Sequence, residues 1–414
     1  MSWKAKLALA ALLAAPAVVL RLAGVVLTDP LALLVFGGGV VAAACILAWA
    51  AEAAEVDIAG SLAVALLALI AVLPEFAVDL YFAFTAGHRP SYAAYAAANM
   101  TGSNRLLIGF GWSLAAIVFI VGARRRGFRR RDGGPVDHVI LKREHRIELG
   151  FLGLASIYAV VIPLTRRIAW YDAIVLIGLF FAYMWRVGQA ERGAPDLIGV
   201  SAAVAGLPTW RRRTVVVLLF LFAAAVVLAA ARPFAEALIG TGRDLGIDEF
   251  LLVQWLAPLA SEAPELVVAS LFAWRGSGSK AVGTLLSAEV NQWTLLVGAL
   301  PIAYLVGGGG WGLPLDHRQN AEFVLTSAQA VLGFAVLANL RFHAWEALVM
   351  LGLFAAQFAL PNPTARLWLA GVYLAIGAVI LVAERRHYPP IARMVMRRDA
   401  EQEEEDEQPE AAVP

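Results

Sequence analysis

Charged residues are scarce in this chain of 414 residues. Asp, Glu, Lys and Arg make up 16% of the sequence, against about 25% in a typical soluble domain. Hydrophobic residues make up 60%, and the mean hydropathy is +0.72. This composition excludes an ordinary soluble domain and predicts a polytopic membrane protein. The net charge of +1 gives no argument for a nucleic-acid partner. The partner expected from composition is the lipid bilayer.

Cysteine is also nearly absent, because Cys45 is the single one in the chain. A disulfide framework within the chain and a cysteine-rich metal cluster are therefore excluded. The chain has no His-Glu-x-x-His, Gly-x-Ser-x-Gly or P-loop pattern, which argues against a membrane-embedded enzyme. No resident cofactor is expected.

Long apolar stretches run through the whole sequence, and they predict an all-α fold of about twelve transmembrane helices. The predicted spans are 7–27, 31–53, 58–84, 91–121, 148–164, 170–189, 214–239, 247–273, 280–306, 321–339, 343–360 and 365–383.

The basic residues are concentrated in a few loops between the predicted spans. Nine Lys or Arg lie between Arg124 and Arg146, and five lie between Arg186 and Arg213, so both loops are expected to be cytoplasmic. With twelve spans both termini fall on the same side. We expect a bacterial cytoplasmic membrane, and an acidic, solvated tail that includes Asp399 to Glu410.

A Pro-Glu pair occurs twice inside apolar stretches, as Pro74-Glu75 and as Pro264-Glu265. A carboxylate within the bilayer is costly and marks an ion or substrate pathway by default. Proline frees a backbone carbonyl from the helical ladder, which is tolerated at this depth mainly where the backbone lines a cavity. The two pairs therefore predict one ion site that is built from two halves.

The two segments are predicted to have opposite orientations. In the twelve-span topology the span of Glu75 runs outward and the span of Glu265 runs inward. The eleven residues from Pro74 and the eleven from Pro264 share five identities. Inverted repeats with interrupted helices near the midplane are typical of secondary transporters that work by alternating access. A passive channel is disfavoured, because it would need rings of like groups from symmetric subunits.

A second polar helix follows each Pro-Glu helix. The first carries Asn99, Gly102, Ser103 and Asn104, and the second runs from Gly283 to Gln292 with Glu289 and Asn291. Small residues let helices approach closely, and side-chain oxygens are suitable ligands for a hard cation. Helical spacing places Asn99 with Ser103 on one face. Oxygens from four helices are therefore expected to converge.

These two motif pairs resemble the alpha repeats of the calcium/cation antiporter superfamily, which includes the sodium/calcium exchangers. The resemblance covers about residues 31 to 360, and it implies a ten-helix exchanger core with extra terminal helices. By position, Glu75 and Glu265 match the paired calcium-binding glutamates of that family. Asn99, Gly102, Ser103 and Asn104 match the second motif of its first repeat.

The chain departs from the family pattern where the family has hydroxyl residues. Ile70-Ala71-Val72 stands in place of Gly-Thr-Ser in the first repeat, and Ala260-Ser261-Glu262 stands there in the second. Ser287-Ala288-Glu289 replaces Gly-Ser-Asn. The sodium-associated hydroxyls are thus depleted and carboxylates are added, which favours a titratable site.

The resulting hypothesis is a cation antiporter that exchanges Ca²⁺, or a related cation, for H⁺ or Na⁺. Sodium/proton exchange on the same scaffold is an alternative. A degenerate member that does not transport and acts as a partner or sensor is another. Glu262 could instead pair with an arginine such as Arg243 or Arg275. The predicted cation ligands are Glu75, Glu265, Asn99, Ser103, Glu289, Asn291, Glu262, Asp79 and Ser261, with Glu75 and Glu265 as the main metal ligands.

The predicted domain organisation follows the repeats. The segments are an extra N-terminal helix (1–30), a first repeat half (31–189), a cytoplasmic linker (190–213), a second repeat half (214–360), an extra C-terminal helix (361–390) and the acidic tail (391–414).

Overall fold

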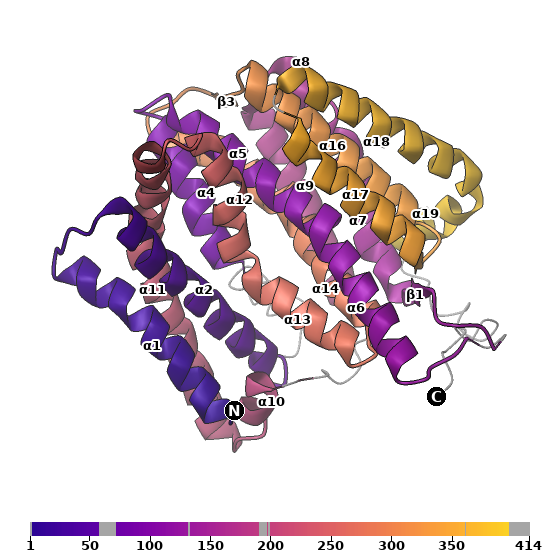
Figure 1. The fold of residues 1–414 in the computed structure, drawn as a ribbon, viewed down its shortest axis with the longest axis horizontal. Helices are drawn as coiled ribbons and strands as arrows, with labels where there is room; N and C mark the ends of the chain where they lie inside the picture. The colour runs from indigo at the N-terminus through magenta and orange to yellow at the C-terminus, as the bar shows by residue number, and fades with distance from the viewer. Residues whose placement is uncertain are drawn as a thin grey trace. The chain divides into compact units, whose positions relative to one another are not determined.

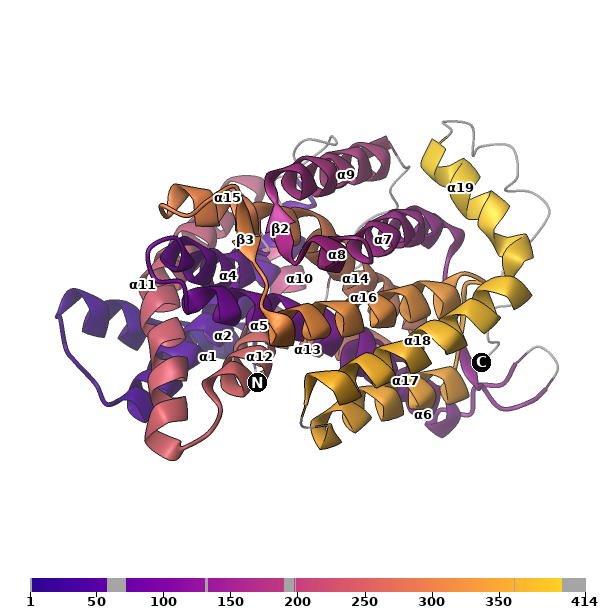
Figure 2. The same cartoon turned by 90° about the horizontal axis from the view of Figure 1, so that it is seen from above.

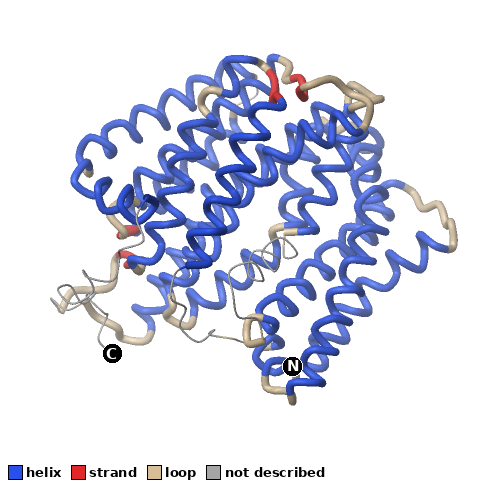
Figure 3. The backbone as a smooth tube through the Cα atoms, turned by 180° about the vertical axis from the view of Figure 1, so that it is seen from behind, coloured by secondary structure: helices blue, strands red, loops and turns tan. Residues whose placement is uncertain are grey.

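The computed structural model describes residues 2–57, 72–130, 133–189, 197, 199–360 and 362–396. The first part of the predicted 58–84 span, most of residues 190–198 and the acidic tail from Asp399 lie outside the described residues. Almost everything described is helical, with only a few three-residue strands (Figure 3). This confirms the predicted all-α class.

Eight helices of the described part are long and apolar enough to cross a membrane, and a ninth span is counted if one bent pair is included. The bent pair is α12 (Glu249–Ser261) and α13 (Ala263–Trp274), which meet at an angle of 53°. A shorter apolar helix covers Ala344–Ala359. The total of twelve spans stays a prediction.

The chain forms two compact units, and each unit draws on three separate stretches of sequence. Unit 1 contains Met1–Ser103, Met184–Pro264 and Ala299–Leu313. Unit 2 contains Asn104–Tyr183, Glu265–Gly298 and Pro314–Pro414. The unit boundaries therefore do not coincide with the repeat halves.

Unit 1 is built around long helices near the N-terminus and in the middle of the chain. Its elements are α1 (Trp3–Leu22), α2 (Asp29–Ala54), α4 (Leu73–Ala86), most of α5 (Tyr92–Arg105), the end of α9 (Trp170–Gln189), α10 (Val200–Ala205), α11 (Thr209–Leu245), α12 and most of α15 (Val297–Val306). Figure 1 shows α1, α2 and α11 lying side by side. Helix α11 ends at Leu245 and is capped by Gly246, whose φ of 66° is a conformation that glycine adopts without strain.

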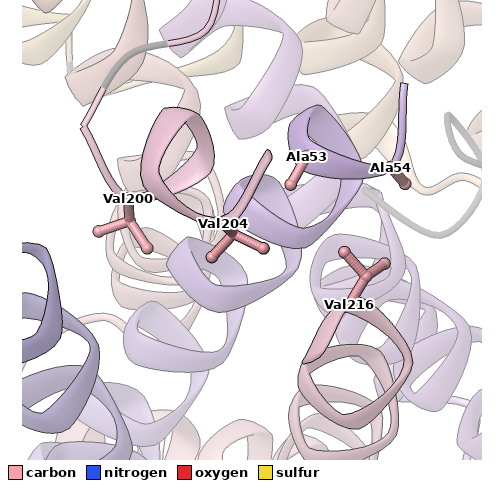
Figure 4. Packing of buried hydrophobic residues seen from close by; sticks show 5 residues of the cluster. All are labelled: Ala53, Ala54, Val200, Val204 and Val216. Carbon is pink, nitrogen blue, oxygen red and sulfur yellow. The ribbon is translucent and has the colours of Figure 1, made fainter. Parts of the chain in front are cut away.

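The short helix α10 lies within the predicted linker and docks onto unit 1. Val200 and Val204 of α10 are buried in one cluster with Ala53 and Ala54 of α2 and Val216 of α11 (Figure 4). The Ser201 hydroxyl also donates a hydrogen bond to Glu52 of α2. The end of the linker is thus packed against the helices that it connects.

Unit 2 contains the remaining helices and the short strands. Its elements are η1 (Leu106–Gly111), α6 (Trp112–Arg125), β1 (His138–Ile140), η2 (Arg143–His145), α7 (Arg146–Ala159), α8 (Ile162–Thr165), β2 (Arg167–Ala169), most of α9, most of α13, α14 (Gly278–Asn291), η3 (Gln292–Leu296), the last residue of β3 (Gly312–Pro314), α16 (His317–Leu337), β4 (Arg341–His343), α17 (Ala344–Ala356), η4 (Gln357–Ala359), α18 (Pro363–Ala383), η5 (Arg385–His387) and α19 (Tyr388–Met396).

Within unit 2, α18 packs along α16 (Figure 2). Helix α16 begins with a capping box, in which the Asp316 side chain accepts from the Gln319 amide at 2.7 Å and the Gln319 side chain accepts from the Asp316 amide at 3.0 Å. Asn362 caps α18 by accepting from the Ala365 amide at 2.8 Å. These caps set where the two helices begin.

Strands β1 and β4 pair in antiparallel fashion, with His138 opposite His343. The two imidazole rings are 4.9 Å apart. Asp137 accepts a hydrogen bond from Arg130 at 2.8 Å and contacts His138 at 2.7 Å. Burial acts to raise the pKa of Asp137, but the bonds to His138 and Arg130 outweigh it and hold the pKa below its usual value.

Candidate ion-binding site

The first Pro-Glu pair lies in the opening turn of α4. The helix begins at Leu73, and Pro74 occupies a position where its missing N–H would have no helical partner. Glu75 is 5% exposed, and Asp79, one turn further along, is fully buried. The free N–H groups of a first turn attract negative charge, so this end of α4 is a suitable place for a buried carboxylate.

Helix α5 carries the polar motif of the first repeat, and its polar residues are buried. Asn99 and Ser103 are at most 1% exposed. The Asn99 side chain lies beside the Asp79 carboxylate, yet neither group forms a well-aligned hydrogen bond within the described residues. The Thr101 hydroxyl, in contrast, donates to the Ala97 carbonyl at 2.7 Å.

Gly102 of α5 makes the closest backbone approach of this region. A Cβ atom placed on Gly102 would lie 1.8 Å from the backbone carbonyl oxygen of Gln254 in α12. That carbonyl has no helical partner four residues later, because Pro258 has no N–H. The Gln254 side chain is also buried, and its amide donates to the Thr101 hydroxyl at 3.4 Å. Glycine at position 102 thus gives α5 direct contact with a freed carbonyl.

The second Pro-Glu pair lies at the break between α12 and α13. Glu262 is the buried residue between the two helices, and Glu265 stands in the first turn of α13. Arg243, one of the arginines considered as a partner for Glu262, instead pairs with Glu249 at 2.6 Å. The Ser261 hydroxyl donates to the carbonyls of Ala257 and Pro258 at 3.2 and 3.3 Å. The interruption predicted for the second repeat is therefore present.

Helix α14 carries the polar motif of the second repeat. Glu289 is fully buried and Asn291 is 6% exposed. Thr284 donates to the Lys280 carbonyl at 2.9 Å, and Ser287 bonds the Tyr183 hydroxyl at 2.8 Å. Glu289, Asn291 and Gln292, which is 1% exposed, are thus the buried acidic and amide groups of this motif.

Both polar helices continue into a π-helical turn. Segment η1 starts two residues after Asn104, and η3 starts three residues after Glu289. π-helical turns are rare and occur frequently at functional sites. Their appearance at matching places in the two repeats adds a second likeness between the repeats, which the sequence comparison did not reveal.

Packing in unit 2 brings the second-repeat helices against η1. A Cβ on Gly111 of η1 would lie 3.0 Å from Leu266 of α13 and 3.4 Å from Leu285 of α14. Leu266 follows Glu265 directly, and Leu285 is one turn before Glu289. Segment η1, which begins two residues after Asn104, thus contacts both the helix that carries Glu265 and the helix that carries Glu289.

The predicted ligands divide between the two units. Unit 1 holds Glu75, Asp79, Asn99, Ser103, Ser261 and Glu262, and unit 2 holds Glu265, Glu289 and Asn291. Within the described ranges, no three His, Cys, Asp or Glu side chains are grouped closely enough to hold a metal ion.

Two polar residues of this region were missed by sequence reasoning. Gln254 is an amide four residues before a proline within an apolar span, and that spacing could have identified a freed carbonyl. Arg105 follows Asn104 directly and is fully buried. A charged residue in the middle of a predicted span is the signal that could have revealed it.

The model of the sodium/calcium exchanger protein family matches residues 29–188 and 215–360. The chain is 38% identical to the crystal structure of the H⁺/Ca²⁺ exchanger CAX, with a TM-score of 0.87 over 95% of this chain and 98% of that one.

More distant proteins share the fold. The structure of native YfkE is 16% identical, with a TM-score of 0.58 over 88% of this chain and 99% of that one. A structure of the sodium-calcium exchanger NCX_Mj soaked with Na⁺ and Sr²⁺ is 19% identical, with a TM-score of 0.52 over 82% of this chain and all of that one.

A curated relative, the putative antiporter CaxA of Alkalimonas amylolytica, is 24% identical over 176 residues. That match spans 37% of this chain and 53% of the relative.

Proposed function

Because this chain belongs to the sodium/calcium exchanger protein family, whose members are transporters and not enzymes, we propose that it is an antiporter that exchanges Ca²⁺, or a related divalent cation, for H⁺. The protein is an integral membrane protein, and we place it in the bacterial cytoplasmic membrane with both termini in the cytoplasm. The paired Pro-Glu motifs carry the proposal: each sets a carboxylate in the first turn of a helix that begins within an apolar stretch.

The ligand set in this proposal comes from both repeats. Glu75 and Glu265 supply the main carboxylates, and Asn99, Ser103, Glu289 and Asn291 supply further oxygens. Glu262 and Ser261 complete the candidate set, and we propose that the Asp79 carboxylate, one turn along α4 from Glu75, carries a proton. Ca²⁺ takes six to eight oxygen ligands in flexible geometry, and this mixture of carboxylate, amide and hydroxyl oxygens is suited to it.

Protons are the proposed coupling ion for two reasons. The first repeat has Ile70-Ala71-Val72 where hydroxyl residues stand in the family pattern, whereas acidic residues are added at Glu262 and Glu289. In addition, the H⁺/Ca²⁺ exchanger CAX is similar to this chain over nearly its whole length. A cation and protons compete for the same carboxylate oxygens, so each excludes the other.

Exchange then requires that the site open to one side at a time. A cation that has equal affinity for the inward-open and the outward-open state does not change their relative populations. The protein with its cation bound can still pass from one state to the other. Broken helices and inverted repeats are the usual means of alternating access around a fixed site. The break at Glu262 supports this mechanism.

The test is uptake of radiolabelled Ca²⁺ by proteoliposomes. An interior more acidic than the exterior should drive uptake, and a sodium gradient at equal pH should not. Glu75→Gln and Glu265→Gln should each reduce uptake to background, while Glu144→Gln, at an exposed site in η2, should leave it unchanged.

Each alternative has its own outcome. Uptake driven by the sodium gradient alone would replace H⁺ with Na⁺ as the coupling ion. Proton flux that follows sodium and ignores calcium would indicate sodium/proton exchange. The absence of all flux from a correctly folded protein would favour the non-transporting partner or sensor.

A further inference from the structure

Arg105 occupies the junction between the polar motif of the first repeat and its π-helical turn. It is the last residue of α5, Asn104 precedes it, and η1 begins at the next residue. Its side chain is 0% exposed. Its Nη2 atom lies 2.7 Å from a carboxylate oxygen of Glu322, and its Nη1 donates to the Gln357 side chain at 2.8 Å. The guanidinium is therefore held from two directions.

The backbone of Arg105 is held as well. The Gln329 side-chain amide donates to the Arg105 carbonyl oxygen at 3.1 Å. Glu322 and Gln329 are seven residues apart on α16, which places them on one face of that helix. Helix α16 thus contacts both the side chain and the main chain of a single residue of α5.

Glu322 has a second cationic partner. Arg366, in the first turn of α18, bonds its other carboxylate oxygen. Glu322 is 1% exposed and Arg366 is 7% exposed. We refer to Arg105, Glu322 and Arg366 as the arginine clamp. Through it, α18 is connected by way of α16 to the residue beside Asn104.

Stability alone does not explain the arginine clamp. Removing three charged groups from water has a large desolvation cost. A protein in which apolar side chains of similar volume replace such buried charges is often equally stable or more stable. The clamp also encloses two positive charges and one negative charge. The best-attested use of such buried ionic groups is to fix the register of one helix against another.

Packing around the clamp leaves η1 little freedom to shift. A Cβ on Gly109 of η1 would lie 2.6 Å from the Gln329 side chain and 2.6 Å from Phe354. A Cβ on Gly333 of α16 would lie 2.9 Å from Trp112. The π-helical turn is thus in direct contact with the helix that supplies Glu322.

We propose that the arginine clamp sets the axial position and rotation of the α5–η1 helix, so that the ligand motif ending at Asn104 keeps its place in the cation path. Helix α18, which lies outside the matched family region, is then a working part of the transporter. Arg105, Glu322 and Arg366 are positioning residues, because they act through the ligand motif. This inference rests on the proposed function in one respect, because one of its two tests measures Ca²⁺ transport.

The experiment compares Arg366→Met with Arg366→Lys, and it uses Arg386→Met, at an exposed site in η5, as the matched control. The first readout is the KM for Ca²⁺ and the maximal rate in proteoliposomes. We expect Arg366→Met to raise the KM about tenfold, as loss of a group that orients a metal ligand does. Arg366→Lys should recover most of the affinity, and Arg386→Met should match the wild type.

The second readout does not depend on transport. Hydrogen–deuterium exchange of peptides that cover residues 99–112 should accelerate in Arg366→Met and stay at the wild-type rate in Arg386→Met. Gln357→Leu, which removes a neutral contact of Arg105 and keeps its volume, should produce a smaller change in the same direction. This variant preserves the test if Arg366→Met does not fold.

The outcomes separate the two proposals. If the wild type transports no cation, the proposed function is wrong. Hydrogen–deuterium exchange over residues 99–112 still tests whether the arginine clamp positions the α5–η1 helix. If the folded variants keep both the wild-type KM and the wild-type exchange rate, the clamp proposal is wrong. A lower unfolding temperature with no change in KM and no local change in exchange would also overturn it, since that is the signature of a purely structural role.

Discussion

Gly102 of α5 lies directly against the backbone carbonyl of Gln254 in α12, with no room for a side chain between them. The carbonyl is available for this contact because Pro258 cannot donate to it. A glycine, an amide residue and a proline from two helices together create a polar point inside an apolar region. This relationship yields the first two predictions.

Replacing Gly102 with alanine should separate α5 from α12. The added Cβ would overlap the Gln254 carbonyl, and overpacking of this kind destabilises a protein by about 1–3 kcal/mol. We expect a lower unfolding temperature in detergent and loss of most Ca²⁺ uptake. Gly178→Ala is the matched control, because a Cβ there meets no atom within 4 Å. Equal behaviour of the two variants would contradict the close contact.

Replacing Pro258 with alanine should restore a hydrogen bond to the Gln254 carbonyl. Proline in a helix interior costs about 3 kcal/mol, so the variant should be at least as thermally stable as the wild type. Its Ca²⁺ uptake should nevertheless fall about tenfold, because the carbonyl is now occupied within its own helix.

Pro16→Ala in α1 provides the comparison for this experiment, since that proline also lies inside a helix but outside both repeats. We expect its uptake to equal that of the wild type. If Pro258→Ala, measured in the same experiment, also takes up Ca²⁺ at the wild-type rate, then the Gln254 carbonyl has no role in the site.

Asp79→Asn should separate proton handling from cation binding. The asparagine keeps the size of the buried side chain but cannot bind or release a proton. We expect Ca²⁺ uptake driven by a pH gradient to fall, while Ca²⁺ binding to the detergent-solubilised protein at pH 8 stays near wild type. Glu75→Gln should lose both. If Asp79→Asn loses binding as fully as Glu75→Gln, then Asp79 is a direct ligand and not a proton carrier.

Asp57 and Arg212 predict a pH effect on stability. Two hydrogen bonds of 2.6 Å from Arg212 hold the pKa of Asp57 below its ordinary value. A carboxylate with a lowered pKa adds stability above its unfolded-state pKa, and it loses this contribution as pH falls through the folded-state pKa. With each side chain 12% exposed, solvent screens part of the attraction.

Asp57→Asn should therefore lower the unfolding temperature by a few degrees at pH 7. The difference from wild type should shrink as the pH falls below about 4, the ordinary value for aspartate. Thermal scans of both proteins across this range provide the check. A difference that grows toward acid pH would have the wrong sign for this ion pair.

Sequence alone predicted the features that depend on local residue order. Proline next to a carboxylate predicted an interrupted helix in the second repeat, and the break between α12 and α13 is present. The family resemblance also rested on short motifs, and it is confirmed by the family match. These features could be predicted because proline removes a backbone hydrogen bond at its own position, and a carboxylate within an apolar span is costly wherever the other helices lie.

Features that depend on distant helices were not predicted. The contact of Gly102 with the Gln254 carbonyl joins two helices that lie about 150 residues apart in the sequence. The π-helical turns after Asn104 and Glu289 have no simple sequence signal. The arginine clamp joins residues 105, 322 and 366, and no local pattern indicates which partners a buried arginine will find.

The division of the chain into three stretches per unit has a consequence for synthesis in the cell. Unit 1 needs Ala299–Leu313 to be complete, and unit 2 needs the segment that follows. Unit 1 is therefore complete only after synthesis has passed Leu313, although α1, α2 and α11, which pack on one another, emerge earlier. Insertion and final assembly of this protein are separate events in time.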